Sequence, residues 1–225
     1  MAKHVGTILL IVASIGLGAC QAPGTASDGA AAAVTEAQVL SQQFDASLLP
    51  YVSDKTRASL TQSWETLDAD QRARFFIAVS PKGPFGSSWA GASSASTDAD
   101  LQRIALQKCE QYSRGACGLA VSKGRNIAYA ETPRTLSYPT TLDTAEIPFL
   151  NTKQRGQLGL EYTARPFAAL ALSRTGFYGY VTGRSSEAAA RREAMSLCEG
   201  TPKERTCFIY SVGTKVVFGP DTKIY

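Results

Sequence analysis

The sequence is internally duplicated, and this duplication constrains the fold more than any other feature. Residues 49–60 match residues 147–158, with Pro, Lys, Arg and Leu identical at equivalent positions. Three further matches follow in the same order in both halves: Ala78-x-Ser80 with Ala171-x-Ser173, Gly86 with Gly179, and Cys109 and Cys117 with Cys198 and Cys207. Such a repeated order indicates two copies of one structural unit.

Both copies predict the same elements. Ser53 and Asn151 are favourable N-cap residues, so each is expected to begin a short leading helix. Two apolar strands, a helix with caps and acids at its start, and two more strands follow. The expected strands are 75–80, 85–90, 118–122 and 126–131 in the first copy, and 168–173, 177–181, 208–212 and 215–219 in the second. The sequence therefore predicts an α+β fold of two tandem repeats, each a small antiparallel sheet (strand-strand-helix-strand-strand) with one helix packed on it.

The remaining segments set the expected domain boundaries. Helical spacing from residue 35 to residue 44 predicts a helical lead-in, so the lead-in and first repeat together cover 35–131. Residues 132–146 contain prolines and no clear period, which is typical of a linker. The second repeat is then expected over 147–225.

A short apolar run near the start of the chain has the form of a bacterial export signal. It covers residues 5–19 and is too short to cross a bilayer, which needs about 20 apolar residues. It leads into Leu17-Gly18-Ala19-Cys20, which resembles the lipobox of bacterial lipoproteins. The resemblance implies that residues 1–19 are removed and that Cys20 receives a lipid. A plain cleaved signal and a membrane span are the alternatives.

The lipobox resemblance also implies a location. Gln21, rather than Asp, follows Cys20, and this resembles lipoproteins of the outer membrane. We therefore expect a lipid-anchored protein that faces the periplasm. Residues 20–34 are mostly small and polar, which predicts a flexible tether between the lipid and the folded part.

Composition excludes several classes of function. The only histidine is His4, which lies in the expected signal. The mature chain therefore lacks Ser-His-Asp and Cys-His catalysis and zinc sites that use histidine. The net charge of the whole chain is only +4, and no basic run with interleaved aromatics is present. We therefore expect no nucleic-acid partner, and also no metal and no cofactor.

Four cysteines remain once Cys20 is set aside. They are Cys109, Cys117, Cys198 and Cys207. An even number in an oxidising compartment favours disulfides over a catalytic thiol or a Cys-only zinc site. In each copy one cysteine ends the helix and the other opens the third strand, so a local bridge in each repeat is expected. Pairing between the copies is the alternative.

The repeated residues resemble the small secreted repeat domains of proteobacterial lipoproteins, a domain family of unknown function. Its pattern is Ala-x-Ser or Ala-x-Asp, then Gly-x-Trp/Tyr-Gly, then Ala-x3-Cys, then Cys before a strand. The matching residues are Ala78, Ser80, Gly86, Ala105, Cys109 and Cys117, and then Ala171, Ser173, Gly176, Tyr178, Gly179, Ala194, Cys198 and Cys207. The first copy departs from the aromatic-glycine element, with Gly83-Pro84-Phe85-Gly86. Other members of the broad family resemble periplasmic immunity proteins against toxins that attack the cell wall.

Carboxylates are the remaining acid–base candidates. Asp98 and Glu187 begin helices, where the helix dipole accounts for an acidic residue. Glu110 and Glu199 follow the cysteines of the two helices, and solvated helix ends account for them. A glycosidase would need two carboxylates facing each other across a cleft. We therefore assign no catalytic residue.

Five residues are candidates for ligand binding. Arg57 and Arg155 recur in the matched segments and could hold a carboxylate or phosphate. The alternative is a structural role in fixing the leading helix to the sheet. Trp89, Tyr178 and Tyr180 are expected on second strands, and outward-facing rings there would suit a protein or a sugar. The alternative for the rings is the core, because strand side chains alternate between faces.

These observations favour a lipid-anchored, non-enzymatic binding module with a protein partner in the periplasm. An inhibitor or immunity protein against a cell-wall hydrolase is the first alternative. A peptidoglycan-binding protein or a carboxylate-based hydrolase is the second.

Overall fold

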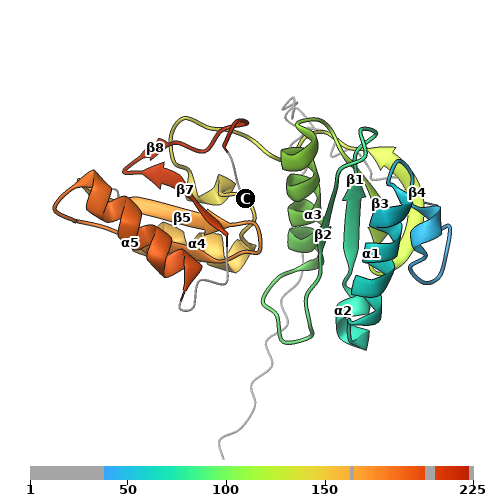
Figure 1. Cartoon of the computed structure of the whole chain (residues 1–225). Coiled ribbons are helices and arrows are strands. Elements are labelled where there is room, and N and C mark those ends of the chain that lie inside the picture. The colour runs from blue at the N-terminus through green and yellow to red at the C-terminus, as the bar shows by residue number, and fades with distance from the viewer. Residues whose placement is uncertain (1–37, 163–164, 201–205, 223–225) are drawn as a thin grey trace, which may run out of the picture. The chain divides into compact units, whose positions relative to one another are not determined.

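The computed structural model describes residues 38–162, 165–200 and 206–222 (Figure 1). A compact unit begins at Glu36 and includes both repeats. The expected signal, Cys20 and the tether lie outside the described residues. Within the described ranges, no helix has the length and apolar character needed to cross a membrane.

Each repeat contains one four-stranded antiparallel sheet, as the duplication predicts. In the first repeat the elements are η1 (Ala46–Leu48), α1 (Asp54–Glu65), α2 (Ala69–Ala73), β1 (Phe76–Val79), β2 (Phe85–Ser88), α3 (Asp98–Ser113), β3 (Gly118–Ser122) and β4 (Arg125–Glu131). In the second they are η2 (Thr144–Glu146), α4 (Thr152–Glu161), β5 (Ala169–Ser173), β6 (Tyr178–Val181), α5 (Glu187–Glu199), β7 (Cys207–Val212) and β8 (Lys215–Val216). The strand orders are β2-β1-β3-β4 and β6-β5-β7-β8. The α+β class and the two similar sheet units are therefore confirmed.

Helices cover both faces of each sheet, which adds a layer to the expected arrangement. In the central strand β1, Phe76 and Ala78 pack in the core beneath α3. Ile77 and Val79 pack in the core beneath α1 on the other face. Figure 1 shows α1 and α3 on opposite sides of β1. The continuous apolar run of β1 reflects this burial on two faces, because a one-sided sheet would alternate apolar and polar residues.

The predicted caps begin the leading helices. The side chain of Ser53 accepts a hydrogen bond from the Thr56 amide in α1, and Asn151 accepts one from the Gln154 amide in α4. A residue with positive φ lies two positions before each cap, Tyr51 at 63° and Phe149 at 64°. The duplication therefore extends to the backbone conformation of the approach to each leading helix.

The expected helix across residues 35–44 is absent from its described part. Residue Val39 instead forms an isolated antiparallel bridge with Ile127 of β4, and the Leu40 amide donates to the Asn126 carbonyl at 2.8 Å. Phe44 then turns into the core, where its ring lies 5.3 Å from that of Trp64. The apolar residues of this segment therefore belong to an extended stretch that pairs with β4, and Phe44 fixes its end in the core.

The linker is part of the second repeat's structure. Thr141 forms an isolated bridge with Lys215, so the linker lies along β8 as the lead-in lies along β4. Leu136 is buried in the core of the second repeat. The boundary expected at residue 147 therefore lies inside a region that already packs with that repeat.

Both disulfides are local. Cys109 is bonded to Cys117, and Cys198 to Cys207, with a Cα–Cα separation of 6.2 Å in each. Each bond joins the C-terminal half of a helix to the start of the neighbouring strand. The structure therefore contains the pairing within repeats, rather than the crossed alternative.

Replacing Cys198 and Cys207 together by alanine is expected to lower the free energy of unfolding by about 2–3 kcal/mol. The pair is nine residues apart, and opening so short a loop returns chain entropy to the unfolded state. Urea unfolding of the variant and the parent protein measures the difference, and reductant should affect the variant less. Non-reducing peptide mapping that linked Cys109 to Cys198 would contradict the local pairing.

Candidate functional site

One face of α3 holds the backbone that leads into the second repeat. Four polar side chains share this face at helical spacing: Asp100, Arg103, Gln107 and Glu110. The Arg103 guanidinium donates to the Leu150 carbonyl at 2.5 Å, and Gln107 Oε1 accepts from the Phe149 amide at 3.0 Å. These contacts hold the backbone at Phe149 and Leu150 against α3.

Asp100 joins the starts of two helices. Its Oδ2 accepts from the Thr97 amide at 3.1 Å, which completes a capping box on α3. Its Oδ1 accepts from the Thr152 amide at 3.0 Å, at the first residue of α4. These bonds and the nearby Arg103 outweigh burial and lower the pKa of Asp100 to about 2.

The interpretation of Glu110 as a solvated helix end is wrong. Its side chain is 0% exposed and accepts hydrogen bonds from the amides of Thr135 at 2.9 Å and Leu136 at 2.7 Å. Glu199, at the equivalent place in α5, is partly exposed. The sequence did not reveal the difference because the groups that cover Glu110 come from the linker.

The helix-start acids make ion pairs. Asp98 lies 3.1 Å from the Lys123 ammonium and 3.3 Å from the Arg74 guanidinium. Glu187 lies 2.7 Å from Arg191, one turn further along α5. Both acids lie in the first turn of a helix, as expected.

Arg57 and Arg155 bind the chain that precedes each leading helix, whereas the structural alternative placed them between that helix and the sheet. Arg57 donates to the Leu49 carbonyl at 2.9 Å and pairs with Asp54 at 2.7 Å. Arg155 donates to the Ala145 carbonyl in η2, the short 3-10 helix that precedes α4. Both guanidinium groups thus hold the chain before the helix against the helix, and neither lines the groove described next.

Tyr178 and Tyr180 belong to the α4 side of their sheet. Their rings stack with centroids 6.5 Å apart and pack against the core of the second repeat. The Tyr180 hydroxyl donates to the Glu161 carboxylate at 2.6 Å, and this bond raises the pKa of Tyr180. The structure therefore separates the two tyrosines from Trp89.

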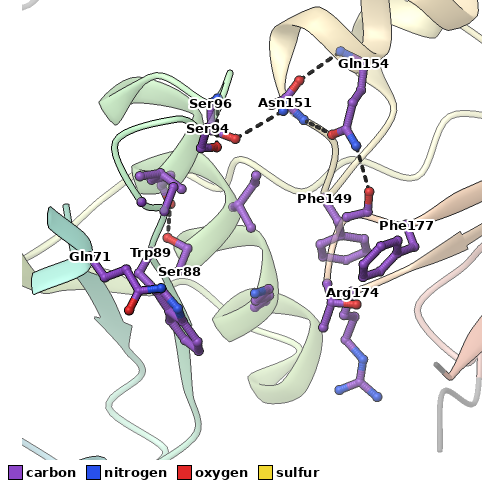
Figure 2. A pocket seen from close by; sticks show the side chains of 17 residues that line it. Gln71, Ser88, Trp89, Ser94, Ser96, Phe149, Asn151, Gln154, Arg174 and Phe177 are labelled. Atoms are coloured by element: carbon purple, nitrogen blue, oxygen red, sulfur yellow. Dashed lines mark hydrogen bonds between the residues drawn. The ribbon is translucent and has the colours of Figure 1, made fainter. Parts of the chain in front are cut away.

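Trp89 lies in a groove lined by both repeats. Two adjoining cavities, of about 540 and 570 Å³, share Trp89, Lys108, Arg174 and Thr175. Figure 2 shows the first cavity, with Trp89 on one wall and Phe177 and Arg174 on the other. The Trp89 and Phe177 side chains are 43% and 45% exposed. The groove therefore offers an accessible ring on each wall.

Two side chains at the start of α4 form hydrogen bonds at one end of the groove. The Asn151 side-chain amide donates to the Ser96 hydroxyl at 3.1 Å, across the two repeats. The Gln154 side-chain amide donates to the Gly176 carbonyl at 2.8 Å and holds the turn that carries Arg174. The leading helix of the second repeat thus positions one wall through its cap and its third residue.

The groove carries positive charge. The Lys108 ammonium donates to the Ser87 carbonyl at 2.9 Å. Burial, and then the neighbouring Arg174 charge, lower the pKa of Lys108 to about 8. The Arg174 guanidinium carbon lies 4.4 Å from the centre of the Tyr112 ring, a cation–π geometry. The described residues that line the two cavities include no Asp or Glu.

The acidic side chains near the groove make structural contacts, and none of them lines it. In the described part of the chain, no group of three or more His, Cys, Asp or Glu is placed to hold a metal ion. The best-placed acids of α3, Asp100 and Glu110, are occupied by backbone amides. The groove instead combines rings, amides and two cations, which are the groups that recognise a ligand.

Sequence reasoning found Trp89 but not Lys108, Tyr112 or Arg174. A comparison of the two copies contains a signal for two of them. Lys108 aligns with Leu197, and Arg174 aligns with Pro81. Both cations thus depart from the repeated pattern, and positions at which two copies differ in charge are candidates for a role outside the shared fold.

Comparison of the chain with protein-family models, with curated proteins and with solved structures finds no match, so its function is inferred from the groove itself.

Proposed function

We propose that this protein is a non-enzymatic binding module whose groove holds a segment of a protein partner. The observation that carries the proposal is the pair of accessible rings, Trp89 and Phe177, on facing walls beside two cations. Tryptophan and arginine are enriched among the residues that dominate binding energy at protein interfaces. Cavities of several hundred Å³ suit a few side chains of a partner.

We further propose that the module works in the periplasm, attached to the outer membrane through a lipid on Cys20. The support is the lipobox-like sequence that ends at Cys20, followed by a low-complexity stretch before the compact unit that begins at Glu36. The two disulfides are consistent with an oxidising compartment. A tether of this kind would let the groove reach partners near the membrane.

The experiment is an affinity capture with groove variants. The oxidised protein, immobilised, is exposed to periplasmic extract in parallel with Trp89→Ala, Phe177→Ala and Leu160→Ala. Leu160 is the matched control, because it is 88% exposed and lies on α4 outside the groove lining. We expect one stoichiometric protein with the parent and with Leu160→Ala, and a loss of about tenfold or more with each groove variant.

Two results would contradict this proposal. Equal capture by all four proteins would show that the groove is not the binding surface. Retention by purified peptidoglycan, without any protein partner, would favour a wall-binding module instead. If the captured protein degrades cell wall, the partner is a hydrolase and the module acts as its inhibitor.

A further inference from the structure

We propose that the groove recognises a carboxylate in the partner segment, an Asp or Glu beside an apolar residue, with Lys108 as its main contact and Arg174 as the second positive charge. This inference rests on the proposed function, because it names the chemistry of the ligand at the same groove.

Lys108 is the strongest reason. Its ammonium group has three N–H donors, and the Ser87 carbonyl accepts from one of them. No Asp or Glu within the described ranges lies close enough to form an ion pair with it. A cation that has lost part of its water, and whose hydrogen-bond acceptor is a neutral carbonyl, is stabilised when an anion arrives.

Arg174 adds a geometry that favours a carboxylate. It reaches the same groove from the turn between β5 and β6, and it stacks on the ring of Tyr112 from α3. A guanidinium presents a planar fork that matches the two oxygens of a carboxylate. The Arg174 charge lowers the pKa of Lys108, and a carboxylate bound at Lys108 would oppose that effect.

The rings supply the second half of the recognition. Trp89 lines both cavities that contain Lys108 and Arg174. A residue that follows or precedes the carboxylate in an extended segment would lie against this ring. The juxtaposition of two cations with an accessible tryptophan therefore selects an acidic segment that also carries an apolar side chain, rather than an isolated anion.

The test is a titration with two matched peptides followed by NMR. The probes are acetyl-Leu-Glu-Leu-amide and its isostere acetyl-Leu-Gln-Leu-amide, added to the oxidised protein. We expect the glutamate peptide to bind about tenfold or more tightly than the glutamine peptide, because charge-assisted hydrogen bonds are the stronger ones. Lys108→Met should abolish this preference, and Lys153→Met, an exposed lysine on α4, should keep it.

The preference should also depend on pH. Lys108 is charged below a pKa of about 8, a value lowered first by burial and then by the nearby Arg174 charge. The bound carboxylate should raise the pKa of Lys108, so the glutamate preference should fade only as the solution becomes clearly more alkaline than pH 8. If Lys108→Met fails to keep the disulfide-linked fold, Arg174→Gln provides the second variant, with a partial loss expected.

Three outcomes would overturn the inference. Equal binding of the two peptides would show that the groove does not recognise a carboxylate. The proposed function would still stand if capture of the partner depended on Trp89. Inorganic phosphate that displaces the glutamate peptide at equal concentration indicates a general anion site. Failure of both peptides to bind also refutes the inference of a carboxylate site. The proposed function is refuted separately, if Trp89→Ala captures the partner as well as the parent protein does.

Discussion

Gly179→Ala is expected to lower the free energy of unfolding by about 3 kcal/mol or more, because the added methyl group meets the backbone of a packed helix. A Cβ atom at this position would lie 2.5 Å from the Ala194 carbonyl oxygen and 2.5 Å from the Cys198 amide nitrogen. Both are backbone atoms of α5, so relief requires the helix to move away from β6. Urea unfolding at equilibrium measures the loss.

Gly86→Ala should act in the same way on the first repeat. Its Cβ would lie 2.3 Å from the Ala105 carbonyl oxygen and 2.5 Å from the Cys109 amide nitrogen. The matched control is Gly156→Ala in the exposed middle of α4, where a Cβ atom would meet nothing within 4 Å beyond its own stretch of helix. That change should raise stability by about 0.5–1 kcal/mol, because alanine favours a helix more than glycine does.

A Gly179→Ala protein with parental stability would show that helix and sheet are not in close backbone contact. A loss in the Gly156→Ala control would point to a general cost of replacing glycine. The two variants together therefore separate close approach from backbone freedom.

These glycines also show why much of the fold was predictable from one sequence. Gly86 and Gly179 occupy equivalent positions in the two copies, and each meets the helix beside its disulfide. The helix caps, the apolar strand segments and the glycines at helix–sheet contacts are local in sequence or recur in both copies. The duplication therefore provides two independent signals for each of them. The leading helix on the second sheet face was less predictable, because its packing partner is not adjacent in sequence.

Contacts between the repeats escaped prediction for a different reason. Asp100 and Gln107 bind residues 52 and 42 positions away. Their equivalents in α5 are Ala189 and Ser196, which lack a comparable acceptor. A duplicated sequence reveals the features that the two copies share. These residues form contacts between the repeats, and they are present in only one copy. Lys108 and Arg174 escaped prediction in the same way.

Asp100→Asn is expected to lower the free energy of unfolding by about 3 kcal/mol at neutral pH, as for other buried carboxylates that lose their charge. The side chain is 2% exposed and accepts from amides at the starts of α3 and α4. An asparagine amide group would place two donors against these N–H groups and Arg103. Both the cap of α3 and the attachment of α4 should weaken.

The pH dependence distinguishes the charge from the shape of this side chain. The folded pKa of about 2 lies below the ordinary Asp value of about 3.9, so Asp100 stabilises the fold above pH 4 and less as the pH falls towards 2. The depression corresponds to about 2–3 kcal/mol. The stability difference between the parent protein and Asp100→Asn should therefore shrink by most of that amount between pH 5 and pH 2.

The control for this acid effect is Asp70→Asn, at an exposed position in α2. Urea unfolding at each pH should give a difference from the parent protein that stays small throughout. A difference for Asp100→Asn that remained constant with pH would contradict the depressed pKa. The loss would then come from the altered hydrogen bonds alone, and the two helix starts would be joined by geometry rather than by a buried negative charge.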